Sequence, residues 1–230
     1  MQPQKIFFNW SSGKDSALAL HYLLQEQQFD VRYLLTSVNT HHNRVSMHGL
    51  RRELLQKQIE SIGIESGTLE VPGQPTNAIY EHLLTKKVQE LRYRGFEFAA
   101  FGDIFLEDLK RYREKQLDAI GIQCVFPLWK KDTKELINEF LNLGFKAITV
   151  CVNGALLDKS FVGRIIDSQF LAQLPKEVDT CGENGEFHTF CFDGPIFSNP
   201  INFRVGEIIQ REYQDGKSTH RFWFCDLLPE

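Results

Sequence analysis

Strand-like and helix-like segments alternate through the first 126 residues, and this alternation is the strongest constraint on the fold of the chain. Short apolar runs are each followed by a stretch with apolar residues at helical spacing. The predicted strands are residues 5–10, 31–38, 67–71, 97–101 and 123–126, and the predicted helices are 15–27, 48–62, 77–94 and 107–120. This order favours a parallel sheet with helices on both faces. We therefore predict an α/β fold.

The second half of the chain has a different pattern. Residues 133–143 and 161–174 are predicted helices, and residues 147–152 are a predicted strand. Near the end, two β-rich runs flank Gln214-Asp215-Gly216-Lys217, which is typical of a hairpin turn. No low-complexity linker separates the two halves. We predict a division near residue 130, into a first domain of residues 1–130 and a second of residues 131–230.

Composition and charge exclude several classes of protein. The net charge of the 230-residue chain is −4, whereas a protein that binds long nucleic acids is usually basic, so nucleic acid is an unlikely partner. No apolar run approaches the roughly 18 residues of a membrane helix, and no secretory signal is recognised. The five cysteines are an odd number without a CxxC pair, which indicates free thiols and a cytoplasmic location.

The segment Ser11-Ser12-Gly13-Lys14-Asp15-Ser16 joins a predicted buried strand to a predicted helix. Small residues at such a junction leave backbone N–H groups unpaired, and with the helix dipole they form a site for phosphate. Lys14 adds positive charge, and Asp15 suits a magnesium ion that bridges phosphates. The alternative is a plain helix cap, with Ser12 and Asp15 as a near capping box. The segment is not a Walker A motif, and the chain has no GxGxxG.

This segment resembles the SGGxDS pyrophosphate loop of the adenine nucleotide alpha hydrolase (PP-loop ATPase) superfamily, with Ser12 in place of the usual glycine. Three more segments, residues 126–129, 158–164 and 182–189, resemble the diphthine–ammonia ligase family, also called N-type ATP pyrophosphatases. The resemblance spans most of the first 195 residues. It implies a five-stranded parallel Rossmann-like (HUP) nucleotide-binding domain with a smaller α+β C-terminal domain.

The resemblance also implies an activity. In such a ligase a substrate carboxylate attacks the α-phosphate of ATP, which gives an acyl-adenylate and pyrophosphate, and ammonia then displaces AMP to leave an amide. We therefore expect a carbon–nitrogen ligase that uses ATP, Mg²⁺ and ammonia. Two alternatives remain open: an ATP-binding regulatory module without turnover, and an RNA-modifying PP-loop ATP pyrophosphatase.

The run from Gly182 to Thr189 reads as a Gly-rich turn when taken by itself. In the diphthine ligases the corresponding run is close to GEGGEYET. Glu183 and Glu186 match that pattern, whereas Asn184 replaces a glycine and His188 replaces an acidic residue. A histidine in place of a carboxylate changes the charge of the acceptor site. We therefore predict an acceptor other than diphthine, such as a cobamide precursor, because the run is similar to that of a bacterial branch of the family.

These considerations assign roles to residues in both halves. The expected catalytic residues are Lys14, Asp15, Glu183, Glu186 and His188, with Asp15 as the metal ligand. The expected ATP-binding residues are Ser11, Ser12, Gly13, Lys14, Asp15, Ser16, Ser37, Asn39, Met47, His48, Gly102 and Asp103. The expected substrate-binding residues are Asp158, Arg164, Glu183, Asn184, Glu186 and His188. The acceptor is a small-molecule or protein-borne carboxylate, and the predicted hairpin offers an edge strand for a possible homodimer.

Overall fold

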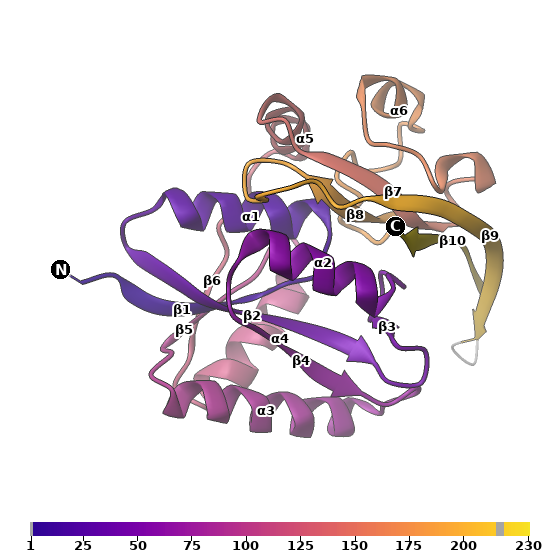
Figure 1. Cartoon of the computed structure of the whole chain (residues 1–230). Coiled ribbons are helices and arrows are strands. Elements are labelled where there is room, and N and C mark those ends of the chain that lie inside the picture. Colours follow the sequence, from indigo (N-terminus) through magenta and orange to yellow (C-terminus); the bar gives the residue numbers. More distant parts are fainter. Residues whose placement is uncertain (1, 215–218) are drawn as a thin grey trace.

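The computed structural model describes residues 2–214 and 219–230, and a parallel sheet forms the centre of its first half (Figure 1). The parallel strands lie in the order β4–β2–β1–β5–β6. Their bounds are β1 (Gln4–Asn9), β2 (Phe29–Asn39), β4 (Ser66–Val71), β5 (Phe98–Ala100) and β6 (Gln123–Val125). A short strand β3 (Arg44–Val45) pairs antiparallel with the last two residues of β2. The five parallel strands confirm the predicted fold class.

Helices cover both faces of this sheet, as the alternating pattern predicts. Figure 1 shows α1 (Lys14–Gln25) and α2 (Arg52–Ile62) on one face, and α3 (Asn77–Tyr93) and α4 (Glu107–Asp118) on the other. Helix α2 begins four residues later than predicted. The reason is local, because Met47 and Gly49 have φ values of 64° and 67°, and this left-handed backbone cannot belong to a right-handed helix. Residues 46–48 form a turn instead.

The second half folds into an antiparallel sheet with the strand order β8–β7–β10–β9. The strands are β7 (Lys146–Asn153), β8 (Phe187–Asp193), β9 (Phe203–Gln214) and β10 (Thr219–Pro229). Helices α5 (Thr133–Asn142) and α6 (Ser168–Gln173) lie on the side of this sheet that faces away from the parallel sheet (Figure 1). The predicted hairpin is present as the pair β9–β10. Most of its predicted turn, residues 215–217, lies outside the described residues.

The prediction of one helix over residues 161–174 is wrong. A single 3₁₀ turn covers Lys159–Phe161, and α6 contains only six residues. Between them the chain pairs with β7: the backbone N–H of Thr149 donates to the carbonyl of Arg164, and that of Gly163 donates to the carbonyl of Thr149. Gly163 also has a φ of 75°. These long-range bonds use the backbone groups that a helix would need.

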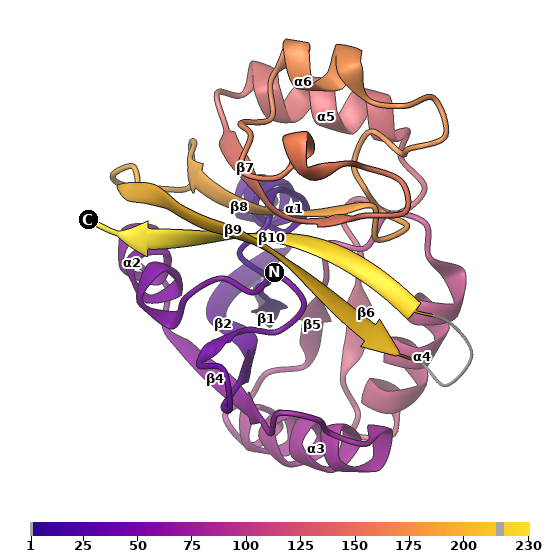
Figure 2. The ribbon, with the colours of Figure 1, turned by 90° about the vertical axis from the view of Figure 1, so that its right-hand side faces the viewer.

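One hydrophobic core joins the two halves. It includes Phe8 and Leu20 from the first half and Phe145 and Val150 from the second. The side chain of Gln58 on α2, which is fully buried, bridges the halves by donating to the carbonyl oxygens of Ser12 (3.0 Å) and Cys191 (2.5 Å). Figure 2 shows the antiparallel sheet lying across α1 and α2. The division at residue 130 stays a prediction, because the core does not separate there.

Within the part of the chain that the structure describes, no helix has both the length and the apolar character that crossing a membrane requires.

Candidate functional site

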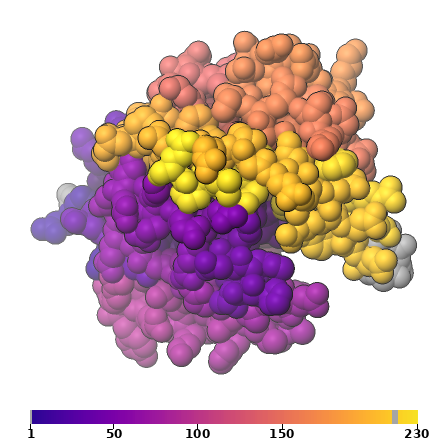
Figure 3. All heavy atoms as spheres, turned by 45° about the vertical axis from the view of Figure 1, so that its right-hand side comes forward, coloured from indigo at the N-terminus to yellow at the C-terminus, as the bar shows by residue number. Residues whose placement is uncertain are grey.

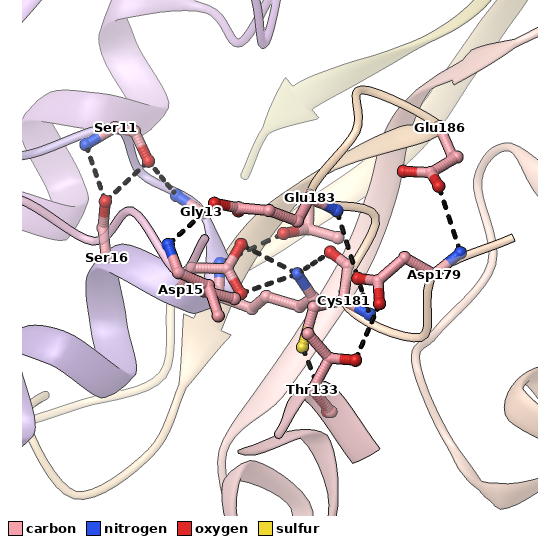
Figure 4. A network of polar contacts seen from close by, with 12 residues as sticks. Ser11, Gly13, Asp15, Ser16, Thr133, Asp179, Cys181, Glu183 and Glu186 are labelled. Carbon is pink, nitrogen blue, oxygen red and sulfur yellow. Dashed lines mark hydrogen bonds and ion pairs between the residues drawn. The ribbon is translucent and has the colours of Figure 1, made fainter. Parts of the chain in front are cut away.

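The loop from Ser11 to Ser16 follows β1 and enters the first turn of α1, at the edge where the parallel strands end. Figure 4 shows Ser11, Gly13, Asp15 and Ser16 of this loop beside Cys181 and Glu183. Ser12 has a φ of 72°, a left-handed conformation that favours glycine. The hydroxyls of Ser11 and Ser16 bond each other at 2.7 Å, and the amide of Gly13 donates to the Ser11 hydroxyl at 3.3 Å. A Cβ on Gly13 would lie 2.7 Å from the His48 ring. The loop is therefore tightly covered, and only glycine fits at position 13.

Ser12 carries two unfavourable features at once. It is fully buried, and its hydroxyl has no hydrogen-bond partner among the described residues. Its backbone conformation is the one that the usual glycine of the superfamily adopts without steric cost. Ser12→Gly is therefore expected to stabilise the protein by about 1 kcal/mol.

Urea unfolding of Ser12→Gly beside the unchanged protein measures this difference. The matched control is Ser11→Gly, which removes a bonded hydroxyl from the same loop and is expected to destabilise the protein. A Ser12→Gly variant that is less stable than the unchanged protein would contradict the expectation.

Lys14 is the first residue of α1 and is almost fully buried, with 2% of its surface exposed. Its ammonium group lies 2.8 Å from each carboxylate oxygen of Asp15, donates to the carbonyl of Cys181, and lies over the ring of Phe187. Burial opposes the charged form, but the charge and hydrogen bond of Asp15, together with the charge of Glu183, outweigh it and raise the pKa of Lys14. Lys14 therefore stays charged and connects the loop to residues 181–187 of the second half.

The expected acceptor turn lies directly against this loop. The carboxylate of Glu183 accepts hydrogen bonds from the backbone N–H groups of Ile104 (2.7 Å) and Phe105 (3.3 Å), which follow β5. Burial raises the pKa of Glu183 to about 7, with further contributions from Asp15 and Asp103, although the two backbone amides oppose the shift. A carboxylate with a pKa near 7 at a sheet edge is suited to accept or release a proton.

Glu186 occupies a different place from the one expected. It is 2% exposed, and its carboxylate accepts three hydrogen bonds: from the backbone of Asp179 (3.0 Å), from the backbone of Asn184 (2.9 Å) and from the side chain of Asn184 (3.0 Å). Figure 4 shows Glu186 apart from the group around Asp15 and Cys181. Its geometry is that of a residue that shapes the turn, and the structure does not bring it to the loop.

Two histidines lie beside the phosphate-type loop. The ring centroids of His48 and His188 are 5.0 Å apart, and Nδ1 of His48 lies 2.9 Å from the carbonyl oxygen of Thr189. Burial lowers the pKa of His48 to about 4, with Lys14 adding to the effect and the Thr189 bond opposing it. Burial, His48 and Lys14 lower the pKa of His188 to about 3. Both rings are therefore neutral at pH 7.

The neutral histidine pair predicts a loss of stability in acid. Because the folded protein holds both rings neutral, the unfolded chain binds protons more readily once the pH falls below about 6.5, the ordinary pKa of histidine. The contribution of the two neutral rings to the stability of the folded protein is complete above that pH and is lost as the pH falls towards 4. We expect the unchanged protein to lose roughly 5 kcal/mol more stability between pH 7.5 and pH 4.5 than a double variant with His48→Gln and His188→Gln. Urea unfolding at the two pH values measures the difference, and equal losses would contradict the expectation.

The other residues expected to bind ATP lie at the same edge with different surroundings. Gly102 approaches the first turn of α1 closely, since a Cβ there would be 3.1 Å from the amide of Ser16. Asp103 forms an ion pair with Arg113 at 2.8 Å.

The side chain of Asn39 forms hydrogen bonds with the backbone of His42 and Gly73, and so it holds two loops together. Ser37 accepts the backbone N–H of Ser46 at its carbonyl, and the side chain of Met47 is exposed.

Two residues expected to bind substrate are not brought to the loop. Asp158 caps the 3₁₀ turn by accepting the backbone N–H of Ser160. The guanidinium of Arg164 donates to Gln173 of α6 and lies over the rings of Phe161 and Phe170. Hydrogen bonds and ring contacts thus direct Arg164 towards the α6 layer. The substrate-binding role expected for Asp158 and Arg164 stays a prediction.

Sequence reasoning gave no role to two residues that hold the site together. The hydroxyl of Thr189 accepts the backbone N–H of Lys14 at 3.0 Å, and so β8 occupies one of the free donors of α1. Gln58 binds Ser12 and Cys191 from the middle of α2. A signal for Gln58 exists in the sequence, because it lies on the same helical face as Leu54, Leu55 and Ile59, where an apolar residue is expected.

Magnesium fits this site only together with a nucleotide. No group of three metal-ligating side chains converges within the described ranges 2–214 and 219–230. Asp15 is the carboxylate nearest the start of α1, and its side chain is 30% exposed. Magnesium commonly takes one or two carboxylates and completes its coordination with phosphate oxygens and water. Asp15 is therefore suited to be a ligand of a magnesium–nucleotide complex.

Comparisons with known proteins identify the family of this chain. The family model described as diphthamide synthase N-terminal domain matches residues 4–124, and the C-terminal domain model matches residues 132–225. The diphthine–ammonia ligase of Bos taurus is 26% identical over 186 residues, which is 77% of this chain and 67% of the relative. That of Mus musculus is 28% identical over 178 residues, covering 74% and 64%. The chain spans about two thirds of the length of these relatives.

One solved structure aligns weakly with this chain. The U34-tRNA thiolase NcsA from Methanococcus maripaludis aligns with a TM-score of 0.37 and 19% identity, over 63% of this chain and 59% of the thiolase. The family assignment rests instead on the two domain models, which match in sequence order. The chain therefore belongs to the diphthamide synthase family.

Proposed function

We propose that this protein is an ATP-dependent, AMP-forming amide ligase that adenylates a carboxylate and amidates it with ammonia. Family membership and the named relatives support the enzyme class, a carbon–nitrogen ligase. The observation that carries the proposal is the contact made by Lys14, which joins the loop 11–16 to the turn that contains Glu183. Through this contact, a phosphate-type loop and a carboxylate suited to proton transfer meet at one edge of the sheet.

The loop residues bind and orient the nucleotide in this proposal. The N-terminus of α1 offers backbone N–H groups and a favourable dipole for the phosphates. The Ser11 and Ser16 hydroxyls bond each other, and the one that accepts in this bond keeps its own O–H as an additional donor. Lys14 acts by positioning the turn, since Asp15 and Cys181 occupy its ammonium group. A magnesium ion, bound with the nucleotide and held by Asp15, would neutralise phosphate charge.

The chemistry has two steps. A carboxylate oxygen of the acceptor attacks the α-phosphorus, and the bond to the bridging oxygen breaks to release pyrophosphate. The nitrogen of ammonia then attacks the acyl carbon, AMP leaves with its oxygen, and the nitrogen gives up a proton. Glu183 is our candidate to receive that proton, because its raised pKa of about 7 matches the proton affinity that a general base needs near neutral pH.

The acceptor is proposed to differ from diphthine. The position that is acidic in the diphthine ligases is His188 here, and the ring is held neutral against His48. A neutral ring at that place offers one donor and one acceptor where the ligases offer a negative charge. A cobamide precursor remains a prediction for the acceptor, and the cytoplasmic location and the homodimer remain predictions as well.

The products of the reaction test the proposal. With Mg-ATP, ammonia and a panel of carboxylates, we expect AMP and pyrophosphate in equal amounts, together with an amide that contains nitrogen from labelled ammonia. Chromatography and mass spectrometry identify all three. ADP and phosphate as the main products would contradict the proposal. AMP release that depends on RNA would favour the RNA-modifying alternative, and no turnover with any acid would favour the regulatory module.

A further inference from the structure

The hairpin formed by β9 and β10 extends from the antiparallel sheet as an arm. In Figure 3 the yellow arm projects from the molecule and leaves an open recess between itself and the surface of the first half. The register pairs Arg211 with Phe222 and Ile209 with Phe224 across the two strands. Directly paired residues and their second neighbours along a strand share one face of the sheet. Tyr213, Arg211, Phe222 and Phe224 therefore lie on the same face, here called the arm face.

The arm face points towards the nucleotide-binding half. A Cβ on Gly49 would lie 3.3 Å from the ring of Phe224, so this ring covers the turn that carries His48. From Phe224 the rings continue outwards: Phe222 is 6.5 Å from Phe224, and Tyr213 is 5.9 Å from Phe222, measured between centroids. Tyr213 is 48% exposed, and Phe222 and Phe224 are half-buried. A row of three rings thus leads from beside the phosphate-type loop to the outside.

The arm face also carries positive charge. The guanidinium of Arg211 lies 5.8 Å from the centroid of Phe224. Its charge, after burial and the charge of His41, contributes to the lowered pKa of His42 in the loop after β2. Among the described residues no carboxylate pairs with Arg211. The opposite face of the arm differs, since Arg221 there is paired with Glu212 at 2.8 Å. An exposed arginine over a row of rings is complementary to a ligand that has an aromatic body and an acidic group.

We propose that the arm face binds the body of the acceptor, and that the acceptor is a ring-bearing carboxylic acid. The rings of Phe222 and Tyr213 stack on the acceptor, and Arg211 attracts its acidic group. The identification of this ligand as the acceptor rests on the proposed function. Three features support it. The row of rings begins at the His48 turn, the positive charge of Arg211 is opposite to that of a carboxylate, and about half of the Tyr213 surface is exposed.

The test uses two probes that differ only in charge, 2-naphthoate and its neutral amide 2-naphthamide, titrated calorimetrically into the full chain. Phe222→Ala is expected to weaken the binding of both probes about tenfold, because stacking is lost for both. Arg211→Gln is expected to weaken 2-naphthoate about fivefold and to leave 2-naphthamide unchanged. The matched control is Arg221→Gln, which removes the same charge from the opposite face and is expected to change neither probe.

Each other result overturns the inference. Undetectable binding of 2-naphthoate at millimolar concentration, or equal binding by the unchanged protein, Phe222→Ala and Arg211→Gln, would show that the arm face is not such a site. Light scattering provides a second criterion, because a dimer that Phe222→Ala dissociates would make the arm face an interface between copies of this chain. The binding experiment involves no turnover. A failure to form AMP would therefore contradict the proposed function without changing the affinities measured for the two probes.

Discussion

Asp15→Ala is expected to lower AMP formation by about a hundredfold or more, because it removes the charged group at the start of α1 that is suited to hold magnesium on the phosphates. The same carboxylate is the ion-pair partner of Lys14. A buried ammonium group without its partner is costly, so the alanine variant is also expected to be less stable. Asp15→Asn separates the two effects, since an amide oxygen still accepts a hydrogen bond from Lys14 but is a weaker magnesium ligand.

Steady-state AMP formation and urea unfolding are measured for both variants. The matched control is Asp108→Ala, which removes an exposed acidic residue from the first turn of α4 and is expected to leave AMP formation unchanged. Near-normal turnover in a well-folded Asp15→Asn variant, with magnesium at limiting concentration, would show that Asp15 does not hold the metal.

Glu183→Gln is expected to reduce amide formation by about a hundredfold while leaving the affinity for ATP unchanged. In the unchanged protein the pKa of Glu183 is raised to about 7, so the carboxylate is protonated below that pH and available as a base above it. The rate of amide formation should therefore rise as the pH increases through 7. The glutamine variant cannot titrate, and its remaining rate should lack this rise.

The neighbouring carboxylate gives the control for this experiment. Glu186 accepts three hydrogen bonds within the turn, and the NH₂ group of a glutamine would face these donors. Glu186→Gln is therefore expected to cost about 2 kcal/mol of stability and to keep the rise in rate near pH 7. If Glu186→Gln removed the rise and Glu183→Gln kept it, the two roles would be reversed.

The amino-acid sequence alone was sufficient to predict the framework of this protein. The parallel sheet, its covering helices and the loop 11–16 follow from patterns within short stretches of chain. In these patterns the spacing of apolar residues identifies strands and helices, and small residues at a strand-to-helix junction identify an anion site. The family pattern also marked Ser12 as a departure, and its φ of 72° gives the reason why glycine is usual there.

Errors arose where distant segments compete for the same backbone groups. Residues 162–166 have helical spacing, but the bonds between Thr149 and Arg164 extend the chain beside β7. The catalytic role expected for Glu186 stays a prediction, but its surroundings differ from those of Glu183 for a related reason. Both glutamates lie in one turn and look equivalent in sequence, yet the backbone of Asp179 and Asn184 surrounds one of them, and the loop after β5 meets the other.

Only the tertiary structure decided how the two halves make one site. Lys14 belongs to the phosphate-type loop, so the sequence predicts that it contacts phosphate. The fold instead directs its ammonium group to Asp15 and the carbonyl of Cys181. His48 and His188 are 140 residues apart in the chain, and their rings meet because β8 lies across the start of α1. Local patterns determine which elements form, but the charge state and direction of a buried side chain depend on partners that packing brings from far along the chain.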